Sequence, residues 1–183
     1  MEIMTASKSS KLSGIVLKKT PCFEKDCMVE LLTPKLGKKK LIAKYALSKS
    51  FRFGGLIEPT QVIDCELYQG KSMLILSQCK LRQTFPHLRS HFNALSIAFY
   101  FIGIIRNITQ FDQPAPPLYQ LLTTTLDSIS DQTDLEHIKR GFHVKLLRHE
   151  GLLQEHRSLT DHEFTRLFYE YTGVKVKKPF LIG

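Results

Sequence analysis

Several features that would mark an enzyme are missing from this sequence. There is no phosphate loop, because Gly54-Gly55 stands alone and residues 37–40 lack the first glycine and the Ser or Thr of that motif. No Gly-x-Ser-x-Gly nucleophile motif occurs. Residues 1–80 contain two pairs of carboxylates at i, i+2 spacing, Glu24 with Asp26 and Asp64 with Glu66. Such a pair on one strand face can hold a metal ion, but acidic residues that alternate along a strand usually form its solvated face. We expect a protein that is not an enzyme and holds no metal or cofactor.

Cysteine and long hydrophobic runs are also scarce. The four cysteines, at positions 22, 27, 65 and 79, form no C-x-x-C pair and have no histidine at zinc-like spacing. We expect them to be small buried side chains in a reducing cytoplasm. The most apolar run, residues 92–105, ends at Arg106 and is shorter than the roughly 20 residues that cross a bilayer. The first 14 residues have no apolar signal core. These features predict a cytoplasmic protein with no membrane partner.

Positive charge is abundant and unevenly distributed. The chain of 183 residues has 26 Lys and Arg against 17 Asp and Glu, a net charge of +9. Residues 1–80 hold 14 basic and 7 acidic residues, a net of +7, whereas residues 81–183 have a net of +2. A surplus of this size favours a phosphate-rich partner. The N-terminal part is therefore the candidate nucleic-acid-binding part.

The densest basic stretch contains no acidic residue over 18 positions. The DNA-contacting candidates in it are Lys35, Lys38, Lys39, Lys40, Lys44, Lys49, Phe51 and Arg52. On a strand, Lys38 and Lys40 share one face and Lys39 takes the other. Cations that follow a phosphate backbone, interleaved with aromatic rings that stack on bases, are typical of single-strand binders. The alternative is a solvated turn and strand edge, with Phe51 and Phe53 packed into the end of a barrel.

Turn residues divide the first 80 residues into five short segments with strand composition, and a helical period follows. The predicted strands are residues 15–19, 28–33, 40–44, 62–68 and 72–76, with a long connector, 45–58, after the third. This order favours an OB-type barrel, although an SH3-like barrel gives the same pattern. Four helices are expected at residues 87–110, 118–129, 137–153 and 164–171. We predict an α+β protein with a five-stranded OB-fold β-barrel domain over residues 1–81 and an α-helical domain over 82–183. Because no flexible linker separates them, the two parts should pack together.

The helical part has basic residues of its own. Lys139, Arg140, Lys145 and Arg148 lie along one predicted helix, where they form either an ordinary solvated face or one side of a groove for an acidic peptide. The basic segment at residues 174–179 is expected to be frayed or to return to the barrel.

The order of motifs resembles that of the bacterial RecO family. The resemblance is carried by Phe23-Glu24-Lys25-Asp26, by Ser48-Lys49-Ser50-x-Arg52-Phe53-Gly54 and by Glu66-Leu67-Tyr68. Weaker likeness continues in Leu146-Leu147-Arg148-x-x-Gly151-Leu152 and in residues 173–181. It implies an OB barrel followed by a helical domain.

The resemblance also implies a function and partners. RecO proteins bind single- and double-stranded DNA, anneal complementary strands and, with RecR, help load RecA onto strands coated by single-strand-binding protein. The family's basic DNA-contacting stretch falls on Lys44, Lys49 and Arg52 here. The acidic tail of single-strand-binding protein would bind the helical domain, for which Arg140 and Arg148 are the candidates. Many members carry a four-cysteine zinc module where this chain has residues 154–158, so we expect a form without that zinc. The implied location is the cytoplasm, near the bacterial nucleoid.

Two other hypotheses fit the same residues. An RNA-binding or ribosome-associated OB protein has the same basic barrel, and an interaction adaptor uses the charge for an acidic protein partner alone. A nuclease is a third and weaker alternative.

Overall fold

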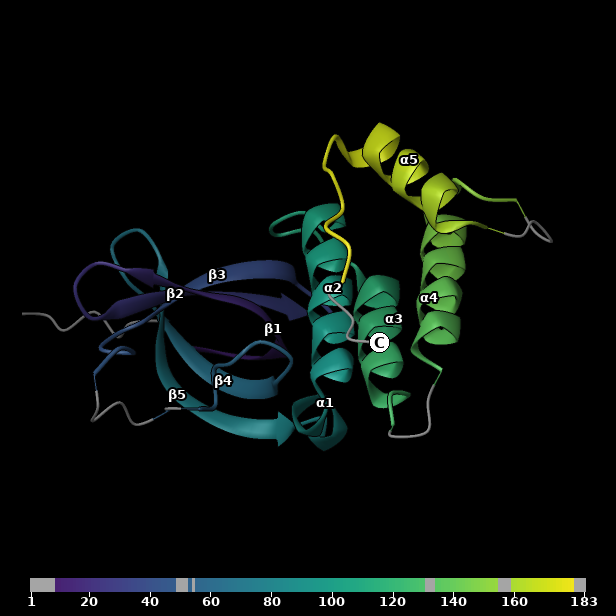
Figure 1. Cartoon of the computed structure of the whole chain (residues 1–183). Coiled ribbons are helices and arrows are strands. Elements are labelled where there is room, and N and C mark those ends of the chain that lie inside the picture. The colour runs from purple at the N-terminus through teal and green to yellow at the C-terminus, as the bar shows by residue number, and fades with distance from the viewer. Residues whose placement is uncertain (1–8, 49–52, 54, 131–133, 155–158, 180–183) are drawn as a thin grey trace, which may run out of the picture.

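A computed structural model describes residues 9–48, 53, 55–130, 134–154 and 159–179 of the chain. Its N-terminal part is a β-barrel and its C-terminal part is a group of helices beside it (Figure 1). The five strands are β1 (Ser9–Cys22), β2 (Asp26–Thr33), β3 (Gly37–Ala43), β4 (Val62–Gln69) and β5 (Leu74–Gln83). All five predicted strand segments are thus found, with longer first and last strands than the pattern indicated.

The strand pairing closes the barrel in the order β1-β2-β3-β5-β4. Residues 9–15 of β1 pair with β4 and residues 15–22 pair with β2, with a register shift between Val16 and Lys18. The ring is closed where β3 and β5 run parallel, with Leu41 opposite Leu74 and Ile42 opposite Ile75. This pairing shows the OB fold and decides against the SH3-like alternative. The single long strand β1 can pair with both β2 and β4 because a bulge lets a strand bend and twist.

The barrel interior is a hydrophobic core of alternate strand residues. Val16, Val29, Leu31, Ile63 and Leu67 are completely buried there. Cys27 and Cys65 belong to the same cluster, which confirms the prediction that they are buried. Cys22 and Cys79 are only partly buried, so the prediction does not hold fully for them.

Among the described residues, five helices follow: α1 (Pro86–Ser90), α2 (Phe92–Ile108), α3 (Pro116–Asp127), α4 (Leu135–His149) and α5 (Asp161–Thr172). The prediction of one helix over residues 87–110 was wrong, because His91 takes an extended conformation that separates α1 from α2. At α5, Thr160 and Glu163 form a capping box, and Gly173 ends the helix with a φ of 70°. None of the described helices is both long and apolar enough to cross a membrane.

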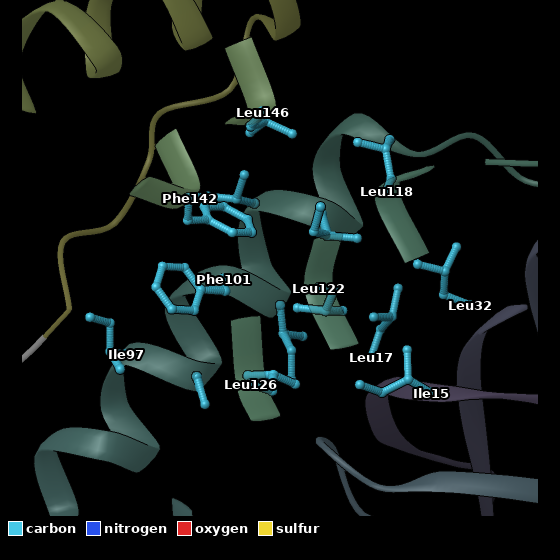
Figure 2. Close-up of a cluster of buried hydrophobic side chains, with 14 of the residues drawn as sticks. Ile15, Leu17, Leu32, Ile97, Phe101, Leu118, Leu122, Leu126, Phe142 and Leu146 are labelled. Atoms are coloured by element: carbon cyan, nitrogen blue, oxygen red, sulfur yellow. The ribbon is translucent and has the colours of Figure 1, made fainter. Parts of the chain in front are cut away.

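A second, larger core joins the barrel to the helices. Ile15, Leu17 and Leu32 point from β1 and β2 toward the helices and meet Leu118 and Leu122 of α3 (Figure 2). The same cluster continues through Phe101, Leu126, Phe142 and Leu146 into the helical part. The two parts therefore pack together, as the absence of a flexible linker predicted.

Polar contacts fasten the same interface. Arg106 of α2 binds Glu30 of β2 through two hydrogen bonds, and the ammonium of Lys38 donates to the carbonyl oxygen of Arg106 at 2.6 Å.

Gly37 opens β3 with a φ of +69°, and a Cβ there would lie 2.0 Å from the carbonyl oxygen of Gln113. Only glycine allows the β2–β3 turn to approach the loop between α2 and α3 this closely.

Candidate nucleic-acid interface

The basic residues around β3 are spread from one end of the barrel to the other. Lys35 lies in the turn before β3, Lys40 lies within the strand, and Lys44 follows its last residue; all three are exposed. A strand of this length spans about 20 Å, so Lys35 lies near the helical part and Lys44 at the far end. These three ammonium groups give an elongated basic strip rather than a compact patch.

Two other lysines of β3 are engaged inside the protein. Lys38 is only 6% exposed, and its ammonium group faces the carbonyl oxygen of Arg106. Burial lowers the pKa of Lys38, and the nearby carboxylate of Glu30 acts in the opposite direction. Lys39 forms an ion pair with Asp112 in which Nζ and Oδ1 are 2.6 Å apart. Neither side chain is exposed as Lys35 and Lys40 are, so Lys38 and Lys39 belong to the docking of the helical part in this structure.

Phe111, in the loop between α2 and α3, contacts two lysines of β3 at once. The ammonium groups of Lys38 and Lys40 both lie 4.5 Å from the centre of its ring. The shared contact confirms that Lys38 and Lys40 occupy one face of the strand. A cation over an aromatic ring is favourable, and here it holds the lysine stems against the helical part.

At the far end of β3, one carboxylate organises two segments. Oδ1 of Asp26 accepts a hydrogen bond from the backbone N–H of Tyr45 at 2.9 Å, and its Oδ2 lies 3.4 Å from the ammonium of Lys44. The backbone N–H of Leu47 donates to the carbonyl oxygen of Lys25 at 2.9 Å. The start of the β3–β4 connector is therefore fixed to the β1–β2 turn.

The connector that follows is only partly described. Lys49, Phe51 and Arg52 lie outside the described residues, so their assignment as DNA contacts stays a prediction. Phe53 is half-buried and packs against the barrel core. This agrees with the alternative in which Phe53 is packed into the end of the barrel.

Sequence reasoning missed a group of exposed apolar side chains at the barrel end farthest from the helices. We call the turn residues 23–25 and the connector residues 44–48 the distal end (Figure 1). Phe23 is 82% exposed, Tyr45 is 63% exposed, and Leu47 is also exposed. The available signal was an aromatic residue in each of two segments outside the predicted strands.

The carboxylate pairs serve structural contacts. Glu24 is exposed at the distal end, whereas Asp26 holds Tyr45 and Lys44. Asp64 accepts from Arg82, and Glu66 pairs with Lys11. Within the described ranges, no group of three or more His, Cys, Asp or Glu side chains is arranged to hold a metal ion.

The basic face of α4 is smaller than its sequence suggested. Arg140 and Arg148 are exposed, as a partner-binding role requires. The placement of Lys139 on that face was wrong: its ammonium is buried and pairs with Glu136 and Asp161, each at 2.7 Å. Beside it, His143 is buried, stacks on Phe164 with ring centres 3.6 Å apart, and shares a hydrogen bond with the Tyr100 hydroxyl.

The basic segment at residues 174–179 packs against the helices, and is neither frayed nor returned to the barrel, the two alternatives expected from the sequence. Val174 and Val176 pack against the helical core, while Lys175 and Lys177 are exposed. The segment forms one wall of a groove of about 670 Å³ whose other wall is α2, with Phe92 and Phe99 exposed along it.

Comparison with known families accounts for both parts of the chain. The family model described as "Recombination protein O N terminal" matches residues 4–85, and the one described as "Recombination protein O C terminal" matches residues 89–153. The chain belongs to the RecO family. In this RecO chain the first match ends directly before α1, and the second covers α2, α3 and α4.

Individual RecO proteins show the same relationship. The DNA repair protein RecO of Alkaliphilus metalliredigens is 33% identical over 144 residues, which is 78% of this chain and 58% of the relative. That of Dehalococcoides mccartyi is 28% identical over 154 residues, or 84% of this chain and 61% of the relative. That of Anaeromyxobacter dehalogenans is 30% identical over 146 residues, or 79% and 58%. The matched part of this chain spans about three fifths of the length of these relatives.

Proposed function

We propose that this RecO chain is a DNA-binding recombination mediator in DNA repair that acts by binding rather than by catalysis. The observation that carries the proposal is the match of both parts to RecO, whose curated relatives are named as DNA repair proteins. The OB barrel and its net positive charge support it, because this fold binds oligonucleotides along its face and end loops. The protein binds single- and double-stranded DNA and anneals complementary strands.

The proposed mechanism is electrostatic. Lys35, Lys40 and Lys44 neutralise phosphates along the barrel, and Lys49 and Arg52, which lie outside the described residues, are proposed as further phosphate contacts. Neutralising phosphates on two strands lowers their mutual repulsion, so that base pairing can begin between them. Contacts of this kind carry no base information, so binding is insensitive to sequence.

The helical part is the proposed docking platform for partners. The acidic tail of single-strand-binding protein is proposed to bind it, with Arg140 and Arg148 as the first candidates. The groove between α2 and residues 174–179 is a second candidate surface, because it combines exposed rings with Lys175 and Lys177. With RecR, the protein would then help load RecA onto strands coated by single-strand-binding protein.

A titration of labelled single-stranded DNA by fluorescence anisotropy at several salt concentrations tests the DNA-binding step. If about six phosphates are contacted, log K falls with log[salt] at a slope near −4, since each contact contributes about −0.7. A slope close to zero contradicts the proposal. A strand-annealing assay, with and without single-strand-binding protein, tests the mediator step. Competition by RNA of the same sequence separates it from an RNA-binding function.

A further inference from the structure

At the distal end of the barrel, two solvent-exposed aromatic residues have a backbone conformation that is energetically unfavourable for bulky side chains. Phe23 has a φ of 55° and Tyr45 a φ of 57°. A residue with a bulky side chain rarely adopts this left-handed region, and glycine or asparagine does so at lower cost. Exposed as they are, the two rings add little to the core. The surrounding structure therefore holds two aromatic side chains outward at a cost, which is a pattern typical of binding sites.

The backbone segments that carry the two rings are hydrogen-bonded to each other. Phe23 and Lys25 are held in the tight turn that ends where Cys22 pairs with Asp26. Asp26 accepts the N–H of Tyr45, and Leu47 donates to the carbonyl oxygen of Lys25. The β1–β2 turn and the β3–β4 connector are thus joined to each other, and each presents an exposed aromatic side chain at the distal end.

The charge beside the rings indicates what they bind. Lys25 is exposed in the same turn as Phe23, together with Glu24, and Lys44 precedes Tyr45. The basic strip of Lys35 and Lys40 leads along β3 toward this end. Cations that follow a phosphate backbone to exposed aromatic rings are the combination that binds single strands, because every base has a face on which a ring can stack. A duplex has no unstacked base to offer.

We propose that Phe23 and Tyr45 are a stacking platform for the unpaired bases of single-stranded DNA. This rests on the proposed DNA binding and deepens it. The rings favour single strands over duplexes, while the lysines bind the phosphates of either. An annealing protein with this arrangement holds bases of one strand at the distal end while the rest of the strand follows β3.

The test uses the full chain and a double variant, Phe23→Gly with Tyr45→Gly. Glycine suits both φ values, so the variant is expected to fold with an unchanged or higher melting temperature. Affinities are measured by anisotropy for a thymidine oligonucleotide, for an abasic strand of equal length and for a duplex. Tyr169→Ala is the matched control, because Tyr169 is an exposed aromatic residue on α5, far from the barrel.

We expect the double variant to lose affinity for the thymidine strand by about five-fold for each ring, or roughly 25-fold together. Its affinity for the abasic strand and the duplex, and its salt slope, should match those of the unchanged protein. Tyr169→Ala should change none of these values. A thymidine strand that carries 5-iodouracil should form photo-crosslinks at Phe23 and Tyr45.

Three other results overturn the platform. In the first, the unchanged protein and the double variant each bind the abasic and thymidine strands with equal affinity. The rings then do not stack on bases, although the protein still binds DNA. If the variant loses affinity for all three ligands alike, the rings act through the fold or the phosphates. If the unchanged protein binds no DNA at all, the proposed function fails with it.

Discussion

The guanidinium group of Arg106 holds the carboxylate of Glu30 through two hydrogen bonds, from Nε to Oε2 at 2.5 Å and from the terminal nitrogen to Oε1 at 3.0 Å. The pair joins α2 to β2 at the edge of the core shared by barrel and helices. Burial acts to raise the pKa of Glu30, but Arg106 and Lys38 outweigh it and hold the pKa below its ordinary value. The carboxylate therefore stays charged within a largely buried interface.

Removing one partner of this pair should destabilise the protein. Arg106→Ala leaves the Glu30 carboxylate buried without its main partner. We expect a loss of about 2–3 kcal/mol in the free energy of unfolding, less than for a fully buried pair because the Arg106 side chain is 34% exposed. Urea denaturation measures it. Arg82→Ala, which removes an exposed partner of Asp64, is the control and should cost no more than about 0.5 kcal/mol. Equal losses in the two variants would show that the Arg106–Glu30 pair stabilises the fold no more than an exposed ion pair does.

Gly37→Ala tests the close approach of the barrel to the helical part. The added Cβ would meet the carbonyl oxygen of Gln113 at 2.0 Å on backbone with positive φ, so the β2–β3 turn must move. We expect a loss of about 3 kcal/mol or more in the free energy of unfolding, from strain and lost packing together. Gly103→Ala within α2 is the matched control, because nothing lies within 4 Å of its added Cβ. The control should be neutral or stabilising by up to about 1 kcal/mol.

Stability should fall on mild acidification because of His143. Burial lowers the pKa of this residue from 6.5 to about 3, with Asp161 acting in the opposite direction. Below pH 6.5 the unfolded chain therefore binds a proton that the folded chain does not. The stabilising contribution is fully present above pH 6.5 and is lost as the pH falls, by about 1.5 kcal/mol between pH 6.5 and pH 5.

Urea denaturation at several pH values checks this dependence. His143→Phe keeps a ring against Phe164 but removes the hydrogen bond to Tyr100, so it should cost about 1–2 kcal/mol at pH 7.5 and lose the slope between pH 6.5 and pH 5. His162→Ala, which changes an exposed histidine, should keep that slope. If the pH dependence of the free energy of unfolding is unchanged in His143→Phe, it arises from other titrating groups.

The exposed lysines of the barrel should control the salt dependence of DNA binding. Changing Lys40 and Lys44 together to Ala is expected to weaken binding on all sequences alike and to reduce the size of the salt slope by about 1.4, or about 0.7 for each lost phosphate contact. Adding Lys49→Ala and Arg52→Ala should reduce it further. Lys80→Ala, an exposed lysine of β5, is the control. A salt slope unchanged by the substitution of Lys40 and Lys44 would show that the phosphates do not contact this side of β3.

Local pattern was enough to predict most of the architecture. Strand alternation and turn residues located all five strands, because these features depend on neighbouring residues. The break at His91 was missed, since no proline or glycine marks it and the extended conformation is seen only in the structure.

What the sequence by itself determined is the order of elements, the RecO resemblance and the concentration of positive charge in the N-terminal part. Only the tertiary structure decided which lysines face solvent. The ammonium of Lys38 is buried and donates to the carbonyl oxygen of Arg106, 68 residues away, and Lys39 pairs with Asp112, 73 residues away. The parallel pairing of β3 with β5 and the outward rings of Phe23 and Tyr45 were decided in the same way. Charge and periodicity belong to single residues and their neighbours, whereas burial and pairing depend on contacts that form only when distant segments meet.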